Sequence, residues 1–157
     1  MGKISDNSTG RKYIFYNGER VHVASNLFNS IILGEVDSFK INDKNEAEII
    51  TNKLYEFLER DEFSNATSLF SSKFLEVTPL DSLNKMFFDV KSLGKYEGRA
   101  LSNFETFVVE GSNPKSEYIF IYDVNYEKFS SQETIRLEKE GDSIKIVTYQ
   151  IHSDGFN

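Results

Sequence analysis

The residues of this chain whose types best suit acid–base chemistry are a carboxylate, Asp123, and a phenol, Tyr96. Asp123 lies between Tyr122 and Val124 in an apolar, β-prone run. A carboxyl group in an apolar pocket can act as a general base, and a Tyr hydroxyl can stabilise an oxyanion. Side chains alternate along a strand, so Asp123 points away from Tyr122, and a carboxylate in such a place is usually exposed to water. Asp123 and Tyr96 are therefore catalytic candidates that require one shared cavity.

A second candidate site is a pocket for a small apolar ligand, walled by aromatic side chains on predicted inward faces. Its expected lining consists of five aromatic residues and one cation: Phe57, Phe87, Tyr96, Phe120, Tyr122 and Arg136. Arg99 is a further cation for an acidic ligand group, although both arginines fit surface ion pairs equally well. The same aromatic residues would form a filled core, which is the usual state of a protein interior and the favoured interpretation. Buried Tyr hydroxyls need polar partners, and this leaves the pocket open as an alternative.

The residue types disfavour other kinds of site. The chain has no Cys and no Gly-x-Ser-x-Gly motif, so no catalytic nucleophile is indicated. His22 and His152 lie far apart, and a calcium loop around Asp43 and Glu46 would need an oxygen ligand where Ala47 stands. The net charge of −7 provides no basic surface for nucleic acid. We therefore expect no metal site, no cofactor and no nucleic-acid partner, and no apolar run approaches the ~18 residues of a transmembrane segment.

These candidate residues need elements to position them, and the middle of the chain predicts three helices. Apolar residues recur at helical spacing over 47–58, over a shorter stretch at 63–74 and again over 80–90. Thr78 is the expected N-cap of the third helix, and Gly94 is expected to end it. The polar face of the first helix is acidic, which indicates a solvated surface or contact with a basic protein partner.

After Gly94 the apolar period changes from that of a helix to that of a strand. Strands are predicted at 98–110, 118–126, around Ile135 and Leu137, and at 144–151. The strand at 118–126 is apolar on both faces at its middle and should be central. Helices followed by antiparallel strands predict an α+β domain, with the helices packed on one face of a curved antiparallel sheet of about four or more strands.

Residues 1–41 are expected to form an N-terminal extension to a domain that spans residues 42–157. Within the extension, Asn-Gly between two β-prone runs predicts a β-hairpin over 13–23. Residues 36–41 are expected to be an extended linker. The domain should then begin with a capping box, in which Asp43 is the acceptor and Glu46 reaches back.

The order of these elements resembles the nuclear transport factor two-like superfamily, whose cone-shaped α+β fold is also described as cystatin-like. It resembles in particular small bacterial domains of unknown function, which are often exported or lipid-anchored. The resemblance covers residues 43–152. It is carried by the helix at 47–58 with the short helix after it, the segment 74–83 that enters the third helix, the exit Leu93-Gly94-Lys95-Tyr96 and the terminal hairpin 135–151.

This resemblance implies a pocket between the helices and the concave sheet face, in a superfamily of enzymes, ligand carriers and association modules. We expect a non-enzymatic binding or association module that holds a small apolar ligand. The alternatives are an isomerase- or dehydratase-like enzyme that uses Asp123 and Tyr96, and a protein–protein interaction domain of the cell envelope. A homodimer through the outer sheet face would cover the uncharged segment 118–122. Export would require a removed N-terminal signal; otherwise the expected location is the cytoplasm.

Overall fold

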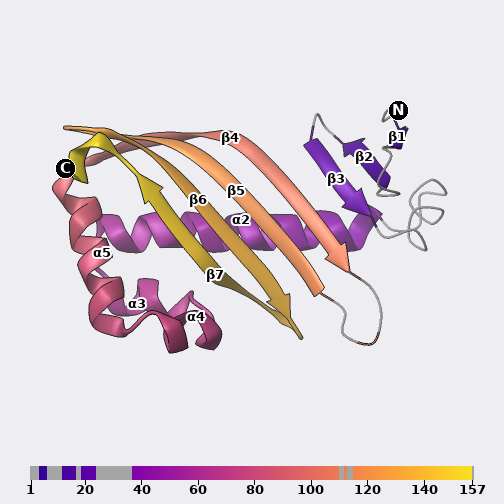
Figure 1. The fold of residues 1–157 in the computed structure, drawn as a ribbon, viewed down its shortest axis with the longest axis horizontal. Coiled ribbons are helices and arrows are strands. Elements are labelled where there is room, and N and C mark those ends of the chain that lie inside the picture. Colours follow the sequence, from indigo (N-terminus) through magenta and orange to yellow (C-terminus); the bar gives the residue numbers. More distant parts are fainter. Residues whose placement is uncertain are drawn as a thin grey trace.

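The structure is a computed structural model. It describes the backbone of residues 4–6, 12–16, 19–23, 37–109, 112 and 115–156, and the side chains of residues 43–108, 112, 115–139 and 141–156. The elements are β1 (Ile4–Asp6), β2 (Lys12–Tyr16), β3 (Glu19–Val23), α2 (Asp37–Glu59), α3 (Phe63–Ser68), α4 (Ser72–Val77), α5 (Leu80–Ser92), β4 (Tyr96–Val109), β5 (Lys115–Tyr126), β6 (Ser130–Glu140), β7 (Ser143–His152) and η1 (Asp154–Phe156). The helices precede a curved antiparallel sheet of the strands β4 to β7 (Figure 1). The predicted α+β class is confirmed.

Strands β4 to β7 form an up-and-down sheet in which each strand pairs with the next along the chain. In β5 every second residue from Tyr118 to Tyr126 is buried, as the alternation predicted. The turn between β6 and β7 contains Gly141 at φ 61°, a left-handed conformation that glycine adopts without strain. The sheet therefore has one inner face, which carries the even-numbered residues of β5, and one outer face.

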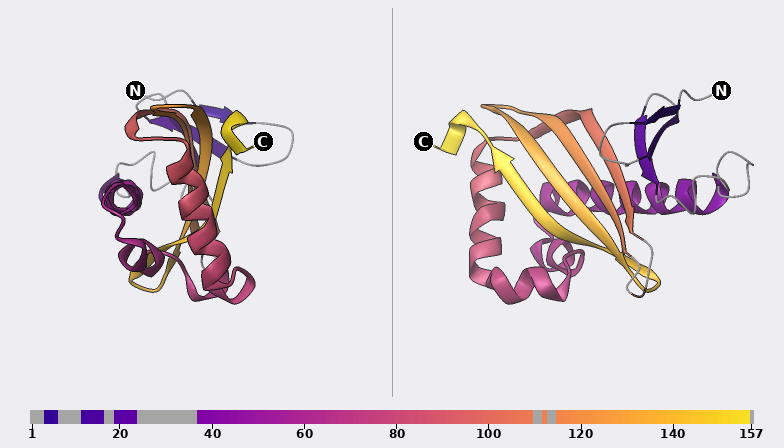
Figure 2. Two further views of the ribbon diagram at one scale, coloured as in Figure 1. Left: turned by 90° about the vertical axis from the view of Figure 1, so that its left-hand side faces the viewer. Right: turned by 45° about the vertical axis from the view of Figure 1, so that its right-hand side comes forward.

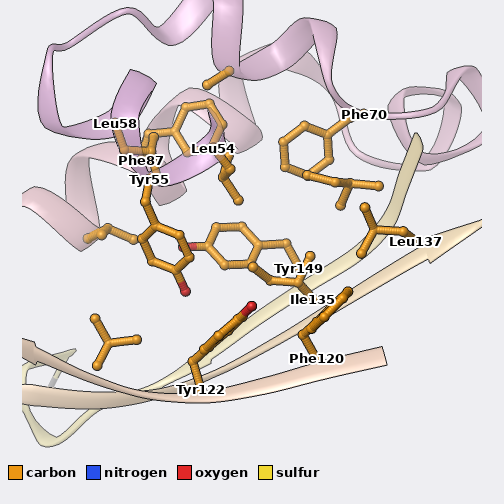
Figure 3. Packing of buried hydrophobic residues seen from close by; sticks show 14 of the residues in the cluster. Leu54, Tyr55, Leu58, Phe70, Phe87, Phe120, Tyr122, Ile135, Leu137 and Tyr149 are labelled. Atoms are coloured by element: carbon orange, nitrogen blue, oxygen red, sulfur yellow. The ribbon is translucent and has the colours of Figure 1, made fainter. Parts of the chain in front are cut away.

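The helices lie on the inner side of this sheet (Figure 2). α2 runs across the inner face, and α5 stands at the end of the sheet where β4 begins (Figure 1). Between them, Leu54, Phe87, Phe120 and Ile135 are completely buried in a single cluster of apolar side chains (Figure 3). These four residues come from α2, α5, β5 and β6, so their contacts fix the helices on the sheet.

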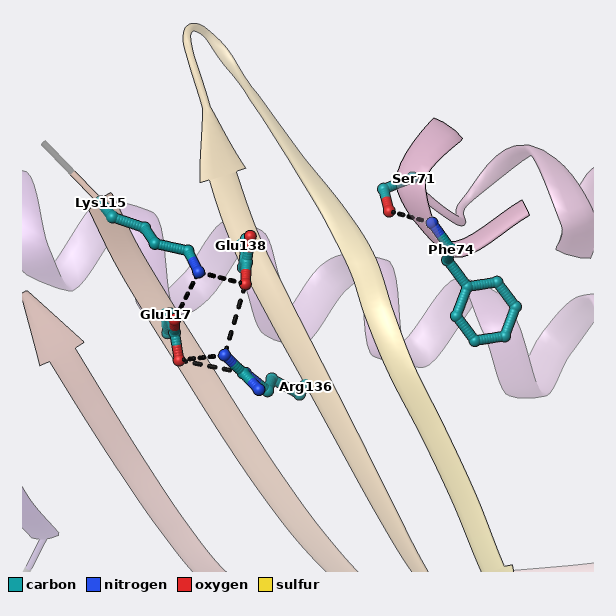
Figure 4. Close-up of polar contacts among 6 residues, drawn as sticks. All are labelled: Ser71, Phe74, Lys115, Glu117, Arg136 and Glu138. Atoms are coloured by element: carbon teal, nitrogen blue, oxygen red, sulfur yellow. Dashed lines mark hydrogen bonds and ion pairs between the residues drawn. The ribbon is translucent and has the colours of Figure 1, made fainter. Parts of the chain in front are cut away.

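β7 is an edge strand, and the connection between α3 and α4 lies against it. The Ser71 backbone N–H donates to the carbonyl of Ile146 at 2.9 Å, and the Ile146 N–H donates to the carbonyl of Leu69 at 2.9 Å. Phe70 forms a parallel bridge with Ile146. The hydroxyl of Ser71 also accepts from the N–H of Phe74 at 3.1 Å, which caps α4 (Figure 4).

The first helix begins earlier than predicted. α2 starts at Asp37, so residues 37–41 are helical where an extended linker was expected, and the helix runs through the expected boundary at residue 42. Asp43 lies inside the helix and not at its cap. Its carboxylate accepts hydrogen bonds from the Tyr118 hydroxyl at 3.1 Å and from Lys139 Nζ at 2.6 Å. Both partners come from the sheet, so no local pattern could reveal them.

The ends of the later helices differ in part from the predicted ones. The stretch 63–74, predicted as one helix, is divided between α3 and α4. Thr78 is the C-cap of α4, whereas Pro79 occupies the N-cap position of α5 without a side-chain hydrogen bond. Gly94 ends α5 as predicted, with φ 102°, and a Cβ there would lie 2.9 Å from the Cβ of Glu127. A side chain at position 94 would therefore be strained in both conformation and space.

The N-terminal strands pair with one another and with the sheet. β2 and β3 are antiparallel, and β3 pairs in parallel with β4 at Glu105 and Thr106. Asn17 and Gly18, the expected turn, lie outside the described residues, so the hairpin over 13–23 stays a prediction.

Candidate functional site

The interior holds a carboxylate that accepts hydrogen bonds from four hydroxyl groups. Glu133 of β6 is 0% exposed. Its Oε2 accepts from the hydroxyls of Tyr55 at 2.8 Å and Tyr149 at 2.9 Å. Its Oε1 accepts from the hydroxyls of Tyr126 and Ser131, each at 2.8 Å. Two hydrogen bonds on each oxygen satisfy the carboxylate without an ion pair to any Lys, Arg or His among the described residues. We name these five residues the Glu133 cluster.

Four elements bring the Glu133 cluster together: α2, β5, β6 and β7 each supply at least one member. Because Ile135 and Leu137 are buried on the inner face, the two-residue period of β6 also directs Glu133 inward. Figure 3 shows Tyr55 descending from α2 and the side chain of Tyr149 lying across the view, with the two hydroxyls close together. The carboxylate therefore links the long helix to three neighbouring strands.

The tyrosines of the cluster are held in their protonated form. Burial, followed by the negative charge and hydrogen bonding of Glu133, raises the pKa of Tyr55, Tyr126 and Tyr149 above the usual value of a phenol. Ionisation would place a second negative charge beside a carboxylate in the buried interior. These three hydroxyls consequently remain donors to Glu133 throughout the neutral pH range.

Arg99 of β4 lies against aromatic rings beside the cluster. Its guanidinium carbon is 4.2 Å from the ring centroid of Tyr55 and 5.0 Å from that of Tyr122. The guanidinium also donates to the Tyr96 hydroxyl at 2.9 Å and to the side-chain oxygen of Asn52. Burial alone would lower the pKa of Arg99, but the hydrogen bond to Tyr96 and the nearby phenols raise it. The charged group thus holds the rings in place through cation–π contacts.

A pocket of about 100 Å³ opens next to the Glu133 cluster, between α2, α5 and the start of β4. Its wall contains the rings of Tyr55, Tyr96 and Tyr126 together with Leu58 and Val90. Because Tyr55 and Tyr126 donate their hydroxyls to Glu133, their carbon atoms and not their oxygens are available to the pocket. We name this the tyrosine pocket.

The rim of the tyrosine pocket is polar. Glu59, Lys91 and Lys95 line it and are exposed, and Lys91 forms an ion pair with Asp61. A cavity of about 150 Å³ is known to admit benzene, so this smaller pocket has room for no more than one small apolar group. The remainder of any larger ligand would lie at the rim.

The outer face of the sheet carries paired charges. Lys115 Nζ lies 2.7 Å from a carboxylate oxygen of Glu117 and 2.7 Å from one of Glu138. Arg136 Nη2 lies 2.8 Å from Glu117 and 3.4 Å from Glu138 (Figure 4). Partial burial alone would raise the pKa of Glu117, but the hydrogen bonds and charges of Arg136 and Lys115 together lower it. We name these four residues the outer cluster.

The five aromatic residues proposed as a pocket lining all lie on the helix side of the sheet. Phe87, Phe120 and Tyr122 are buried in the core, Phe57 is half-buried at its border, and Tyr96 lines the tyrosine pocket. The structure therefore places most of this set in packed core and one member at a pocket.

The structure separates the proposed cation from those aromatic residues. Arg136 belongs to the outer cluster, because it alternates with the buried Ile135 and Leu137. The cation that contacts the aromatic side chains is Arg99, the other arginine that the sequence suggested for a carboxylate group.

The two catalytic candidates also lie apart. Asp123 is exposed on the outer face, where Gln132 Nε2 approaches its Oδ1 at 3.4 Å. Tyr96 lies on the inner side, at the tyrosine pocket. The tyrosine pocket does not include Asp123, so the geometry gives no support to acid–base catalysis by this pair.

Sequence reasoning did not single out Glu133 or Tyr55. The signal for Glu133 was present, because the inward positions Ile135 and Leu137 extend backward by two residues to position 133. A glutamate at an inward position of a central strand demands buried donors. Five tyrosines are buried among the described residues, and only the structure shows that Tyr55, Tyr126 and Tyr149 are the donors.

Some classes of feature are not found in the part of the chain that the structure describes. No group of three or more His, Cys, Asp or Glu side chains there is arranged to hold a metal ion. None of the described helices is long and apolar enough to cross a bilayer. Comparison of the chain with protein-family models, with curated proteins and with solved structures gave no match.

Proposed function

We propose that this protein is a non-enzymatic binding module that holds a small apolar group in the tyrosine pocket. The observation that carries the proposal is the fixed wall of that pocket. Tyr55 and Tyr126 are anchored through their hydroxyls to the buried Glu133, and Tyr96 is anchored by Arg99. A wall that is already ordered loses little conformational entropy when a ligand binds.

The size and polarity of the tyrosine pocket define the ligand class. Its interior is aromatic and aliphatic, which favours a single ring or a short alkyl chain. The exposed rim presents Lys95 and the Lys91–Asp61 pair, so a polar end of the ligand would remain in contact with water. The proposed ligand is therefore a small amphiphile that inserts its apolar end.

A blocking variant tests the proposal. Val90→Phe enlarges a wall side chain and fills the pocket, whereas Val77→Phe makes the same change at a residue that is 80% exposed on α4. The measurement is an amide NMR titration of each protein with phenol and with benzoate. We expect saturable shifts around residues 55–59 and 90–96 in the original protein and in Val77→Phe, and their loss in Val90→Phe.

Two results would contradict the proposal. One is the absence of saturable shifts with both probes in the original protein. The other is an identical response of Val90→Phe and Val77→Phe, which would place any binding outside the tyrosine pocket. The unfolding midpoint in urea, measured for both variants, separates loss of binding from loss of folding.

A second candidate role is association of two copies through the outer face. It is supported by Ile119 and Ile121, which are half-buried on that face beside the outer cluster. Ile121→Lys would place an unpaired charge in such an interface. Light scattering over a concentration series is expected to give a dimer that this variant converts to a monomer, and a monomer at all concentrations of the original protein would contradict the association.

A further inference from the structure

A second, larger depression lies on the outer face of the sheet, away from the tyrosine pocket. Its volume is about 740 Å³, and it is shallow and widely open to solvent. It is formed by the ends of β5, β6 and β7 and by η1, so all of its lining belongs to the described residues. We name it the polar groove.

The floor of the polar groove is a row of three planar polar side chains. Asp123, Gln132 and His152 are neighbours in register on β5, β6 and β7, and all three are exposed. Adjacent strands are about 4.8 Å apart, so the row extends over roughly 10 Å. Gln132 Nε2 approaches Asp123 Oδ1 at 3.4 Å, and no other side-chain hydrogen bond of either residue is found among the described residues.

One wall of the polar groove is the C-terminal turn. Ser153 Oγ donates to the carbonyl of Ser130 at 2.7 Å and accepts from the N–H of Gly155 at 3.2 Å. A Cβ on Gly155 would lie 2.5 Å from Leu93 Cδ2 and 2.8 Å from the ring of Phe129, so only glycine permits this close approach. The turn holds Phe156 at the groove, where it is 40% exposed.

The charges of the polar groove limit the class of ligand that it can bind. The exposed carboxylate of Asp123 lies on its floor, and its lining includes no Lys or Arg. An anionic ligand would therefore be repelled. Metal binding is not supported, because the described residues hold no group of three ligating side chains. A mixture of amide, imidazole, carboxylate and hydroxyl groups instead matches a neutral ligand whose groups both donate and accept hydrogen bonds.

We propose that the polar groove binds a neutral sugar. The ring hydroxyls of a sugar would bond to the row formed by Asp123, Gln132 and His152, and its C–H face would pack on the ring of Phe156. The length of the row accommodates more than one sugar ring, so the ligand class is a neutral oligosaccharide. This site is distinct from the tyrosine pocket, because the two share no lining residue.

The test is an amide NMR titration of the full chain with maltose, cellobiose and diacetylchitobiose. We expect at least one of these sugars to give saturable shifts at residues 123–125, 130–132 and 151–156, with a dissociation constant of about 1 mM. Gln132→Ala and Phe156→Ala should each weaken that binding about fivefold or more. Gln150→Ala is the matched control, because Gln150 is exposed on the outer face of β7 and does not line the groove.

The outcomes are decisive in either direction. Saturable binding that Gln132→Ala weakens and Gln150→Ala leaves unchanged supports the proposal, even if Phe156→Ala disturbs the C-terminal turn. The absence of saturation with all three sugars overturns it. Binding of tetralysine at the groove without binding of any sugar also overturns it, because the lining would then act as an acidic surface for a basic peptide.

Discussion

Two glutamates of the same strand are stabilised in opposite ways. Glu133 and Glu138 both belong to β6, and both are nearly or completely buried, at 0% and 6% exposed. Glu133 faces the helices and receives hydroxyl hydrogen bonds. Glu138 faces outward and forms ion pairs with two cations, Lys115 and Arg136.

The difference shows how the position of a carboxylate decides its partners. At the outer face, long cationic side chains can reach Glu138 while remaining about 40% exposed, so their desolvation is limited. In the interior, an ammonium or guanidinium group would also have to be buried. Tyr hydroxyls avoid this penalty because their rings contribute apolar surface to the core. The inner carboxylate is therefore tied to the packing of the fold, and the outer one to exposed charges.

The sharpest test removes each carboxylate in turn. Glu133→Ala is expected to lower the free energy of unfolding by about 5 kcal/mol, because it leaves four buried hydroxyls without their acceptor and creates a cavity. Glu138→Ala should lower it by about 1 kcal/mol. Urea unfolding measures both values. Glu133→Gln, expected to lose about 2 kcal/mol, provides a measurable variant if Glu133→Ala does not fold. Equal losses at positions 133 and 138 would contradict the distinction.

Alkaline pH should destabilise the folded protein through the tyrosines of the Glu133 cluster. The pKa of Tyr55, Tyr126 and Tyr149 is raised in the folded protein, whereas in the unfolded chain phenols ionise near pH 10. Stability from these groups is therefore complete below about pH 10 and falls as the pH rises further. At about pH 11 the three should together lower the free energy of unfolding by about 4 kcal/mol.

Tyr149→Phe checks the origin of this alkaline effect. The variant should reduce the slope of stability against pH above about pH 10 by about 1.4 kcal/mol per unit, the contribution of one phenol. Urea unfolding at a series of pH values gives the slope. An unchanged slope would show that Tyr149 ionises equally in the folded and unfolded states.

Loss of a single hydroxyl should have an intermediate effect. Tyr55→Phe retains the ring that packs under Arg99 and removes one donor to Glu133. We expect the free energy of unfolding to fall by about 1.5 kcal/mol, as for a hydrogen bond to a charged group. Tyr96→Phe is the control, since its hydroxyl meets a half-exposed guanidinium, and it should lose about 0.5 kcal/mol. A smaller loss for Tyr55→Phe than for Tyr96→Phe would contradict the larger contribution that we assign to the hydrogen bond with Glu133.

The smallest expected effect is that of salt, which should weaken the outer cluster and leave the Glu133 cluster unchanged. At about 1 M NaCl the Debye length is about 3 Å, so the interactions of the partly exposed outer cluster are screened. The loss caused by Glu138→Ala should then fall from about 1 to about 0.5 kcal/mol or less. The loss caused by Glu133→Gln should not change. Thermal or urea unfolding at low and high salt measures the difference, and an equal response of the two variants would argue against it.

The fold was predictable where a local pattern determines structure. The alternation from Tyr118 to Tyr126, the apolar spacing of α5 and the stop at Gly94 all appear in the structure. The start of α2 was not predictable, because Asp43 and Glu46 imitate a cap. Asp43 instead bonds with residues 75 and 96 positions away, and such partners leave no trace in a local window.

The candidate site was predictable in part. Tyr96 and Arg99 were both named from the sequence, and both lie beside the tyrosine pocket or its wall. Glu133 was missed because a glutamate is normally assigned to the surface by its type. One of its donors, Tyr55, is 78 residues away, so the pairing depends on how the helix crosses the sheet. Arg136 was assigned to the wrong face, although the burial of Ile135 and Leu137 on either side of it already indicated the outer one.

The connection between α3 and α4 has a consequence for the behaviour of the protein at high concentration. An edge strand with free N–H and C=O groups can recruit a strand from another molecule and begin aggregation. On β7, both backbone groups of Ile146 are already bonded to the segment around Phe70. A foreign strand cannot extend the sheet along the middle of this edge unless that segment first detaches. Resistance to aggregation at β7 is therefore set by the local opening of a short helical connection, which can occur without unfolding of the sheet.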